Sequence, residues 1–112
     1  MEDRNGALWI GTESGMARYD GHSWQRFTMK DGLGLPSVNV IFQDKEGVLW
    51  FGSASLSRGG VTRYDGKTWH TFTTQDGLAG WEVLDILQDG DGVFWLATEN
   101  GVSRIESIDL AP

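Results

Sequence analysis

The side chains able to do chemistry in this chain are few, and most of them are carboxylates. The 112-residue sequence has no cysteine and two histidines, and its 16 acidic residues outnumber nine basic ones to give a formal charge of -7. Without cysteine there is no thiolate nucleophile, no disulfide and no cysteine-based zinc site. The negative charge opposes the counterion release that drives nucleic-acid binding, so we expect no nucleic-acid partner.

The closest approach to a metal motif is DGDG at residues 89–92. Closely spaced carboxylates at a turn are typical of part of a calcium loop. However, the equivalent turns elsewhere in the chain read DRNG and DKEG, and no bidentate glutamate follows at the required distance. We therefore favour a hairpin turn there. His22 and His70 do not occupy matching positions, and no Ser-His-Asp relay is evident, so we predict no catalytic residue, no metal and no cofactor.

The residues that recur define a tandem array. GALWIGTESGMARYDGHSW begins at Gly6, GVLWFGSASLSRGGVTRYDGKTW at Gly47 and GVFWLATENGVSRIE at Gly92, at spacings of 41 and 45 residues. The difference of four is an insertion in the SASLSRGG segment. Because repeated units bury their apolar surface mainly against one another, we interpret the repeated residues as architecture and look for function where the copies differ.

Short β-branched and aromatic runs alternate with Gly, Asp and Asn clusters, and no segment keeps a helical period for two turns. The chain therefore reads as all β, with four strand types per copy. The predicted strands are 38–43 and 83–88 (type A), 8–11, 48–52 and 93–98 (type B), 16–19, 61–64 and 102–105 (type C), and 24–28 and 69–73 (type D). Four antiparallel strands at this repeat length are typical of a β-propeller blade.

The strand count predicts one propeller fragment of about two and a half blades, with boundaries near 3–36, 37–81 and 82–112. Closed propellers need about 4 to 8 blades, so both end faces would expose apolar surface. We expect them to be covered by further blades of a parent protein or by a homo-oligomer that closes the ring, with a dimer favoured. The repeated tryptophans are predicted to pack between blades: Trp9, Trp24, Trp50, Trp69 and Trp95.

The patterns D-x-x-G-x-L-W-x-G-T, G-x-x-R-Y-D-G-x-x-W and F-T-x-x-D-G-L together resemble the two-component regulator propeller repeat. Residues 3–40 and 44–85 carry this pattern, and 89–106 carry its first half. Ser53 in place of threonine, the insertion after it, and Ile105 in place of tyrosine depart from the pattern. The resemblance implies the periplasmic sensor region of a bacterial hybrid histidine kinase or a cyclase-linked receptor, responsive to carbohydrate or another solute.

The positions that differ between copies fall where B-to-C loops and D-to-A connections are expected to share one edge. Trp81 takes the place of Pro36, and its indole could stack on a glycan or simply anchor its loop. Arg58 could bind a carboxylate or sulfate, or remain a solvated charge. The other candidate ligand-binding residues on this edge are Glu13, Glu82, Glu99 and Asn100. Asp85, which replaces Val40, could line the central channel as a hydrated carboxylate.

Three functions compete. The resemblance favours a non-enzymatic sensor or ligand-binding segment. The alternatives are an enzyme like the streptogramin lyase propellers, whose histidine and metal site has no counterpart here, and a purely structural self-association module. No apolar run approaches the roughly 20 residues that cross a bilayer, and MEDRNGALWIG lacks a signal-peptide pattern, so we expect a soluble chain without membrane insertion.

Overall fold

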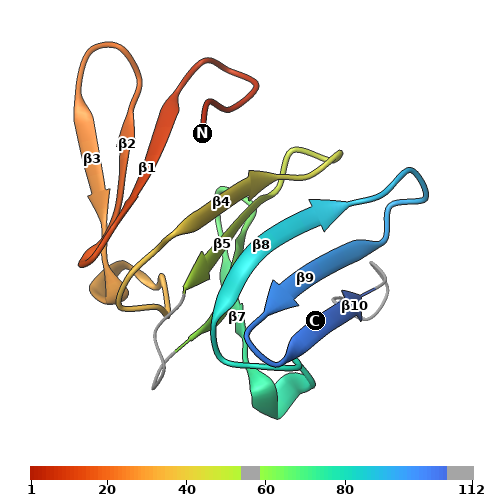
Figure 1. Ribbon diagram of the computed structural model, residues 1–112. Coiled ribbons are helices and arrows are strands. Elements are labelled where there is room, and N and C mark those ends of the chain that lie inside the picture. The colour runs from red at the N-terminus through yellow and green to blue at the C-terminus, as the bar shows by residue number, and fades with distance from the viewer. Residues whose placement is uncertain (54–58, 106–112) are drawn as a thin grey trace.

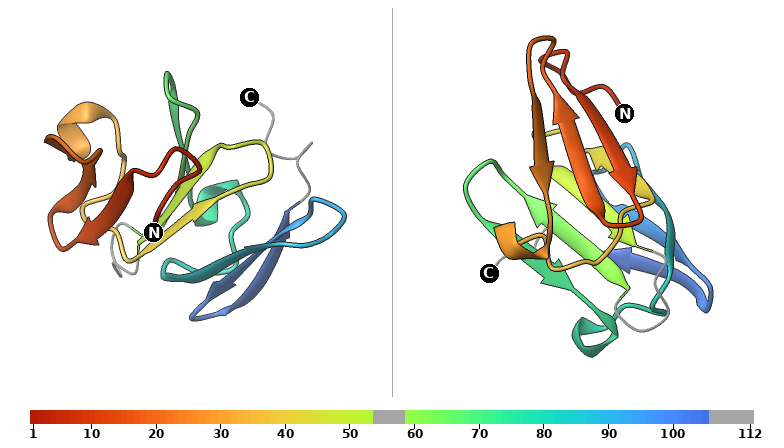
Figure 2. Two further views of the ribbon diagram at one scale, coloured as in Figure 1. Left: turned by 90° about the horizontal axis from the view of Figure 1, so that it is seen from above. Right: turned by 90° about the vertical axis from the view of Figure 1, so that its left-hand side faces the viewer.

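Three antiparallel sheets stand side by side in this chain, as Figure 1 and the view from above in Figure 2 show. The computed structural model describes residues 1–53 and 59–105. The strands are β1 (Leu8–Thr12), β2 (Gly15–Tyr19), β3 (Trp24–Phe27), β4 (Val40–Gln43), β5 (Leu49–Ser53), β6 (Gly60–Tyr64), β7 (Trp69–Phe72), β8 (Val83–Gln88), β9 (Phe94–Thr98) and β10 (Gly101–Ile105).

Each sheet is a meander of consecutive strands, and we call the sheets blades 1, 2 and 3. Blade 1 is β1-β2-β3, blade 2 is β4-β5-β6-β7 and blade 3 is β8-β9-β10. This confirms the predicted fold of about two and a half open, all-β propeller blades. At the position where blade 2 has β4, blade 1 has a single antiparallel bridge between Glu2 and Leu8 among the described residues.

Strand β4 starts two residues later than predicted. Val38 still belongs to the connection from blade 1, where its N–H donates to the Thr12 carbonyl at 3.0 Å. Val38 crosses directly over Gly11, where a Cβ would collide with the Val38 carbonyl oxygen. A side chain at position 11 would therefore push the connection off blade 1, which explains why only glycine fits there.

Two single turns of 3-10 helix, η1 (Met29–Asp31) and η2 (Thr74–Asp76), open the connections between blades. The sequence pattern did not predict them, because one turn is too short to show a period. In each, a threonine and the aspartate three residues later cap each other's backbone, and a glycine with a φ of 105° ends the turn. The threonine, aspartate and glycine are Thr28, Asp31 and Gly32 in η1, and Thr73, Asp76 and Gly77 in η2.

An aspartate and a tryptophan six residues later recur as a hydrogen-bonded pair in every blade. One carboxylate oxygen accepts turn N–H groups and the other accepts the indole Nε1–H. The indole bonds are Asp3–Trp9 at 2.8 Å, Asp44–Trp50 at 2.8 Å and Asp89–Trp95 at 2.9 Å. In DGDG, Asp89 Oδ1 also accepts the N–H of Asp91 and of Val93, which confirms the hairpin turn.

Two apolar cores lie between the blades, and the connections contribute to both. The core between blades 1 and 2 contains Trp9, Met16, Phe27, Leu33, Leu35, Val38, Leu49 and Phe51. The core between blades 2 and 3 contains Trp50, Val61, Phe72, Leu78, Val83, Ile86, Phe94 and Leu96. Burial of this much aliphatic and aromatic surface is the main force that holds neighbouring blades together.

Glutamine side chains also join each blade to the one before it. Gln43 Oε1 accepts the Arg4 N–H at 2.9 Å, and Gln88 Oε1 accepts the Lys45 N–H at 2.8 Å. In both cases the donor lies in an Asp-to-Gly turn of the previous blade, before β1 for Arg4 and between β4 and β5 for Lys45. The same contact therefore repeats across both blade interfaces, so the two interfaces have one geometry.

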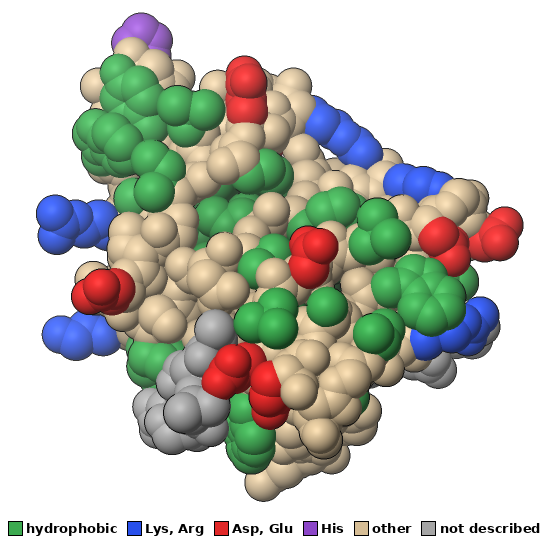
Figure 3. Space-filling model, viewed as in Figure 1, with side chains coloured by type: hydrophobic (Ala, Val, Ile, Leu, Met, Phe, Trp, Pro, Cys, Tyr) green, Lys and Arg blue, Asp and Glu red, His purple; other side chains and the backbone are tan. Residues whose placement is uncertain are grey.

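The two end faces of the array remain apolar and exposed. The free face of blade 1 carries Leu8, Ile10, Ala17, Trp24 and Arg26; the free face of blade 3 carries Leu87, Trp95 and Val102. In Figure 3, hydrophobic side chains gather at the tip of the β2-β3 hairpin and over β8 and β9.

The burial of the repeated tryptophans follows from this arrangement. Trp9 and Trp50 are buried and Trp69 is half-buried between blades, as predicted. The prediction is wrong for Trp24, which is 60% exposed, and for Trp95, which is half-buried but belongs to neither core between blades. Both lie on free faces, where no neighbouring blade is present among the described residues.

Candidate functional site

The loop edge, as we name it, consists of residues 79–82 before β8 and the turn 98–101 between β9 and β10. Glu99 in the turn accepts the N–H of Glu82 at 2.9 Å and the N–H of Trp81 at 3.3 Å. Two neighbouring N–H groups therefore converge on one carboxylate. This confirms that a D-to-A connection and a B-to-C loop share one edge of the blade.

Asn100 and Ser103 hold the start of the same connection. Asn100 Nδ2 donates to the Ala79 carbonyl at 3.0 Å, and the Ala79 N–H donates to Ser103 Oγ at 2.8 Å. Position 80 in the same connection is glycine, and a Cβ there would collide with the Glu99 carboxylate. The comparison of the copies did not select Ser103, and the signal that could have found it is its alignment with Thr62.

The electrostatics of the loop edge keep Glu99 charged. Its hydrogen bond from the Glu82 N–H is the main cause that lowers the pKa of the Glu99 carboxyl, and the Trp81 N–H adds to the effect. Because its carboxylate is occupied by backbone donors, Glu99 acts here as a brace. Trp81, whose N–H is one of these donors, is itself 37% exposed.

The structure brings together four of the seven predicted site residues: Trp81, Glu82, Glu99 and Asn100. Glu13 lies on blade 1, in the turn between β1 and β2. Asp85 lies on β8 beside a β-bulge, exposed, where its Oδ1 accepts the Ile86 N–H at 2.9 Å. It is not part of the loop edge. Arg58 lies outside the described residues.

The histidines and carboxylates of the described residues form no metal centre. Nowhere in residues 1–53 and 59–105 do three or more His, Cys, Asp or Glu side chains come together in a way that could hold an ion. His22 lies in the exposed β2-β3 turn, and His70 is exposed on β7, with its ring 4.3 Å from Phe72. The two imidazoles are thus on different blades.

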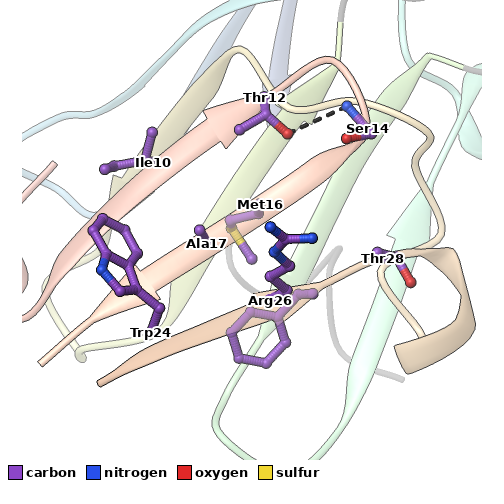
Figure 4. A pocket seen from close by; sticks show the side chains of 9 residues that line it. Ile10, Thr12, Ser14, Met16, Ala17, Trp24, Arg26 and Thr28 are labelled. Carbon is purple, nitrogen blue, oxygen red and sulfur yellow. Dashed lines mark hydrogen bonds between the residues drawn. The ribbon is translucent and has the colours of Figure 1, made fainter. Parts of the chain in front are cut away.

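A second feature, which the sequence reasoning did not single out as a site, is a hollow of about 680 Å³ on the free face of blade 1. Its walls come from β1, β2 and β3, and Figure 4 shows their side chains. The residues that line it include Ile10, Thr12, Ala17, Trp24, Arg26 and Thr28. The indole of Trp24 and the guanidinium of Arg26 both stand over this face.

Comparison with known proteins supports the fold. Residues 32–55 and 79–100 match the family model of the two-component regulator propeller, which confirms the resemblance noted above. The matched segments contain the connections between blades and the first strands after them. A search of curated proteins found no match.

Two solved structures from B. thetaiotaomicron are similar. The extracellular domain of BT3049, named as a hybrid two component system, shares 19% identity at a TM-score of 0.73, over 100% of this chain and 17% of that one. The extracellular domain of BT4673, named likewise, shares 22% identity at a TM-score of 0.67, over 93% of this chain and 14% of that one. This chain therefore spans less than a fifth of the length of either structure.

The fold and the repeats together define the class. The chain has the fold of consecutive β-propeller blades, and two segments of it match the two-component regulator propeller repeat. Within the described residues, no helix is long and apolar enough to span a membrane.

Proposed function

We propose that this chain is a non-enzymatic segment of the periplasmic sensor region of a two-component signalling receptor, and that its loop edge binds a carbohydrate or another small solute. The family match and the likeness to extracellular domains of hybrid two component systems support the sensor role. The observation that carries the binding role is the part-exposed indole of Trp81 on a connection braced by Glu99 and Asn100.

The chemistry of the loop edge suits a neutral polyhydroxylated ligand. An indole face packs against the C–H face of a sugar ring, and this contact needs a side chain that is already held in place. The braces hold the backbone of residues 79–82 before a ligand arrives, so binding costs less conformational entropy. The nearby Glu82 carboxylate is half-buried and can accept hydroxyl hydrogen bonds.

The test is a titration of the full chain with a panel of oligosaccharides, repeated for Trp81→Ala. We expect saturable binding to at least one glycan, weakened about tenfold or more by Trp81→Ala because stacking is lost. Trp24→Ala is the matched control, since Trp24 is exposed but distant from the loop edge; it should leave glycan binding unchanged. Equal losses in both variants, or no glycan bound, would contradict the proposal.

A second role, favoured by the two exposed end faces, is end-to-end association. We propose that the free faces of blades 1 and 3 are covered by further blades or by a second copy of the chain, with a dimer closing a ring of six blades. Exposed Trp24, Leu87 and Val102 support this, because monomers seldom leave such apolar surface uncovered. Mass measurement in solution at micromolar concentration tests it, and a clean monomer would exclude the dimer.

A further inference from the structure

We propose that the hollow on the free face of blade 1 is a binding socket for an Asp-Gly-Leu connection of another propeller repeat. The chain itself contains two filled examples of this socket, one on blade 2 and one on blade 3. The proposal goes beyond the sensing role, and it does not require ring closure by identical chains.

The filled socket on blade 2 holds the connection that follows η1. Leu33 and Leu35 are 0% and 1% exposed and pack against Phe51, which is itself 0% exposed. The Leu33 carbonyl accepts a hydrogen bond from the buried Thr62 hydroxyl at 2.6 Å. Two leucines and one carbonyl are thus the features that blade 2 recognises.

Blade 3 holds the next connection at the equivalent positions, with a different hydrogen bond. Leu78 is 6% exposed and belongs to one core with Phe94 and Leu96. Ser103, at the position of Thr62, accepts the Ala79 N–H at 2.8 Å. The rim differs from blade 2 because Glu99 accepts two further N–H groups of the connection, as described above.

Blade 1 carries the same socket elements without a guest among the described residues. Ile10 occupies the position of Phe51 and is 43% exposed, and Trp24 occupies the position of the half-buried Trp69. The hollow of about 680 Å³ lies over these side chains. It is the space that the leucines fill on blades 2 and 3.

The turn between β1 and β2, which borders the hollow on blade 1, matches the turn between β9 and β10 on blade 3. Glu13 follows Thr12 as Glu99 follows Thr98, and both turns have the same internal bond. The Ser14 N–H donates to Thr12 Oγ1 at 3.2 Å, and the Asn100 N–H donates to Thr98 Oγ1 at 3.2 Å. Glu13 therefore has the same place in its turn as Glu99, whose carboxylate accepts the N–H groups three and four residues after the leucine of an Asp-Gly-Leu sequence.

The strands under the hollow on blade 1 differ from the equivalent strands of blade 2 at two positions. Ala17 stands where blade 2 has Thr62, so the hydroxyl donor is missing, and Arg26 stands where blade 2 has Thr71. The exposed guanidinium of Arg26 can donate to the guest carbonyl from the side, and it attracts an acidic guest. The guest of best fit is thus a short acidic segment with a buried leucine and two consecutive N–H groups.

The probe is a peptide with the sequence of residues 73–82, TTQDGLAGWE, capped at both ends. The full chain, labelled with 15N, is titrated with this peptide up to millimolar concentration. We expect saturable shifts of the amide signals of Ile10 and Ala17 and of the Trp24 indole. The same peptide with Leu78→Asp should produce none, because the leucine pocket rejects a charge.

Variants of the chain locate the binding. Ile10→Asp should weaken binding by about tenfold or more, whereas Leu84→Asp at an exposed position of β8 is the matched control and should leave it unchanged. Ala17→Thr should tighten binding about fivefold by restoring the missing hydroxyl, the fold-change of one neutral hydrogen bond. Equal losses from Ile10→Asp and Leu84→Asp would overturn the proposed binding site.

A fusion of the peptide to the chain detects binding even if the free peptide binds weakly. Fusing the peptide ahead of Met1 through a flexible Gly-Ser linker raises its effective concentration to about millimolar or above. We expect the fusion to shield Trp24 from acrylamide quenching and the Leu78→Asp fusion to leave it accessible. Absence of shielding together with absence of titration shifts refutes the proposal. Glycan binding and its loss in Trp81→Ala are measured separately, so failure of the peptide experiment does not affect the sensing role.

Discussion

The face of blade 2 that meets blade 1 and the free face of blade 1 are built on the same repeat, yet they differ in burial. On blade 2, Leu49 and Phe51 are 7% and 0% exposed; on blade 1, the equivalent Leu8 and Ile10 are each 43% exposed. The strand pairing is the same in both, so the difference comes from the neighbour alone. A blade face is therefore completed by what docks on it, including the connection that enters from the previous blade.

The largest expected effect separates a covered residue from its exposed equivalent. Phe51→Ala should destabilise the chain by about 3 to 5 kcal/mol, because it opens a cavity in the core between blades 1 and 2. Ile10→Ala, at the same position on blade 1, should cost less than about 1 kcal/mol because little buried contact is lost. Urea unfolding followed by tryptophan fluorescence measures both. Equal costs would contradict the difference in burial between the two faces.

The aspartate–tryptophan pairs allow a second comparison between a covered position and an exposed one. Asp44→Ala should cost about 2 kcal/mol, because Asp44 is 6% exposed and its loss leaves the Trp50 indole N–H without its partner in a closed core. Asp89→Ala should cost less, since Trp95 lies on a free face where water can replace the carboxylate. Thermal unfolding of the two variants gives the difference. A larger loss from Asp89→Ala would contradict it.

A smaller effect concerns the hydroxyl that recognises the connection. Thr62→Val keeps the shape of a 0% exposed side chain but removes the 2.6 Å bond to the Leu33 carbonyl. We expect a loss of about 1 to 2 kcal/mol in the free energy of unfolding. Ala17→Val on blade 1 has no such bond to lose and should change stability little. A neutral Thr62→Val would mean that the leucines alone hold the connection.

The smallest expected effect is the release of the loop edge in acid. Since the bonds from Glu82 and Trp81 lower the pKa of Glu99, its contribution to stability is complete above the ordinary value of 4.5 and is lost as the pH falls below it through the folded pKa. The amide signals of Trp81 and Glu82 should shift together in that range. Glu99→Gln should remove the transition, and persistence of the transition in that variant would assign it to another carboxyl.

Much of the fold was predictable because its signals are local. The apolar runs alternate with turn residues over short windows, and Trp9, Trp50 and Trp95 recur at matching positions. These signals predicted the strands, their order and the open ends. The single-turn helices and the late start of β4 at Val40 were missed, since neither has a pattern of its own: a capping turn is too short, and Val38 is drawn across Gly11 by contact with blade 1.

The candidate site was predictable only in part. Comparison of the copies pointed to Trp81, Glu82, Glu99 and Asn100, and the structure does bring them together. It also shows that Glu99 and Asn100 bond to the backbone, which no spacing could reveal because the partner is a main-chain group. The hollow over Ile10 and Trp24 needed the filled equivalents on blades 2 and 3 before it could be recognised.

By itself, the sequence determined the blade: its strands, its turns and the residues that every copy repeats, all of which follow from local backbone preference and period. The tertiary structure decided which faces are covered, because burial depends on a neighbour that the repeat cannot specify. Trp50 and Trp95 stand at the same place in the repeat, and only blade 3 packed over the first of them makes one buried and the other half-exposed.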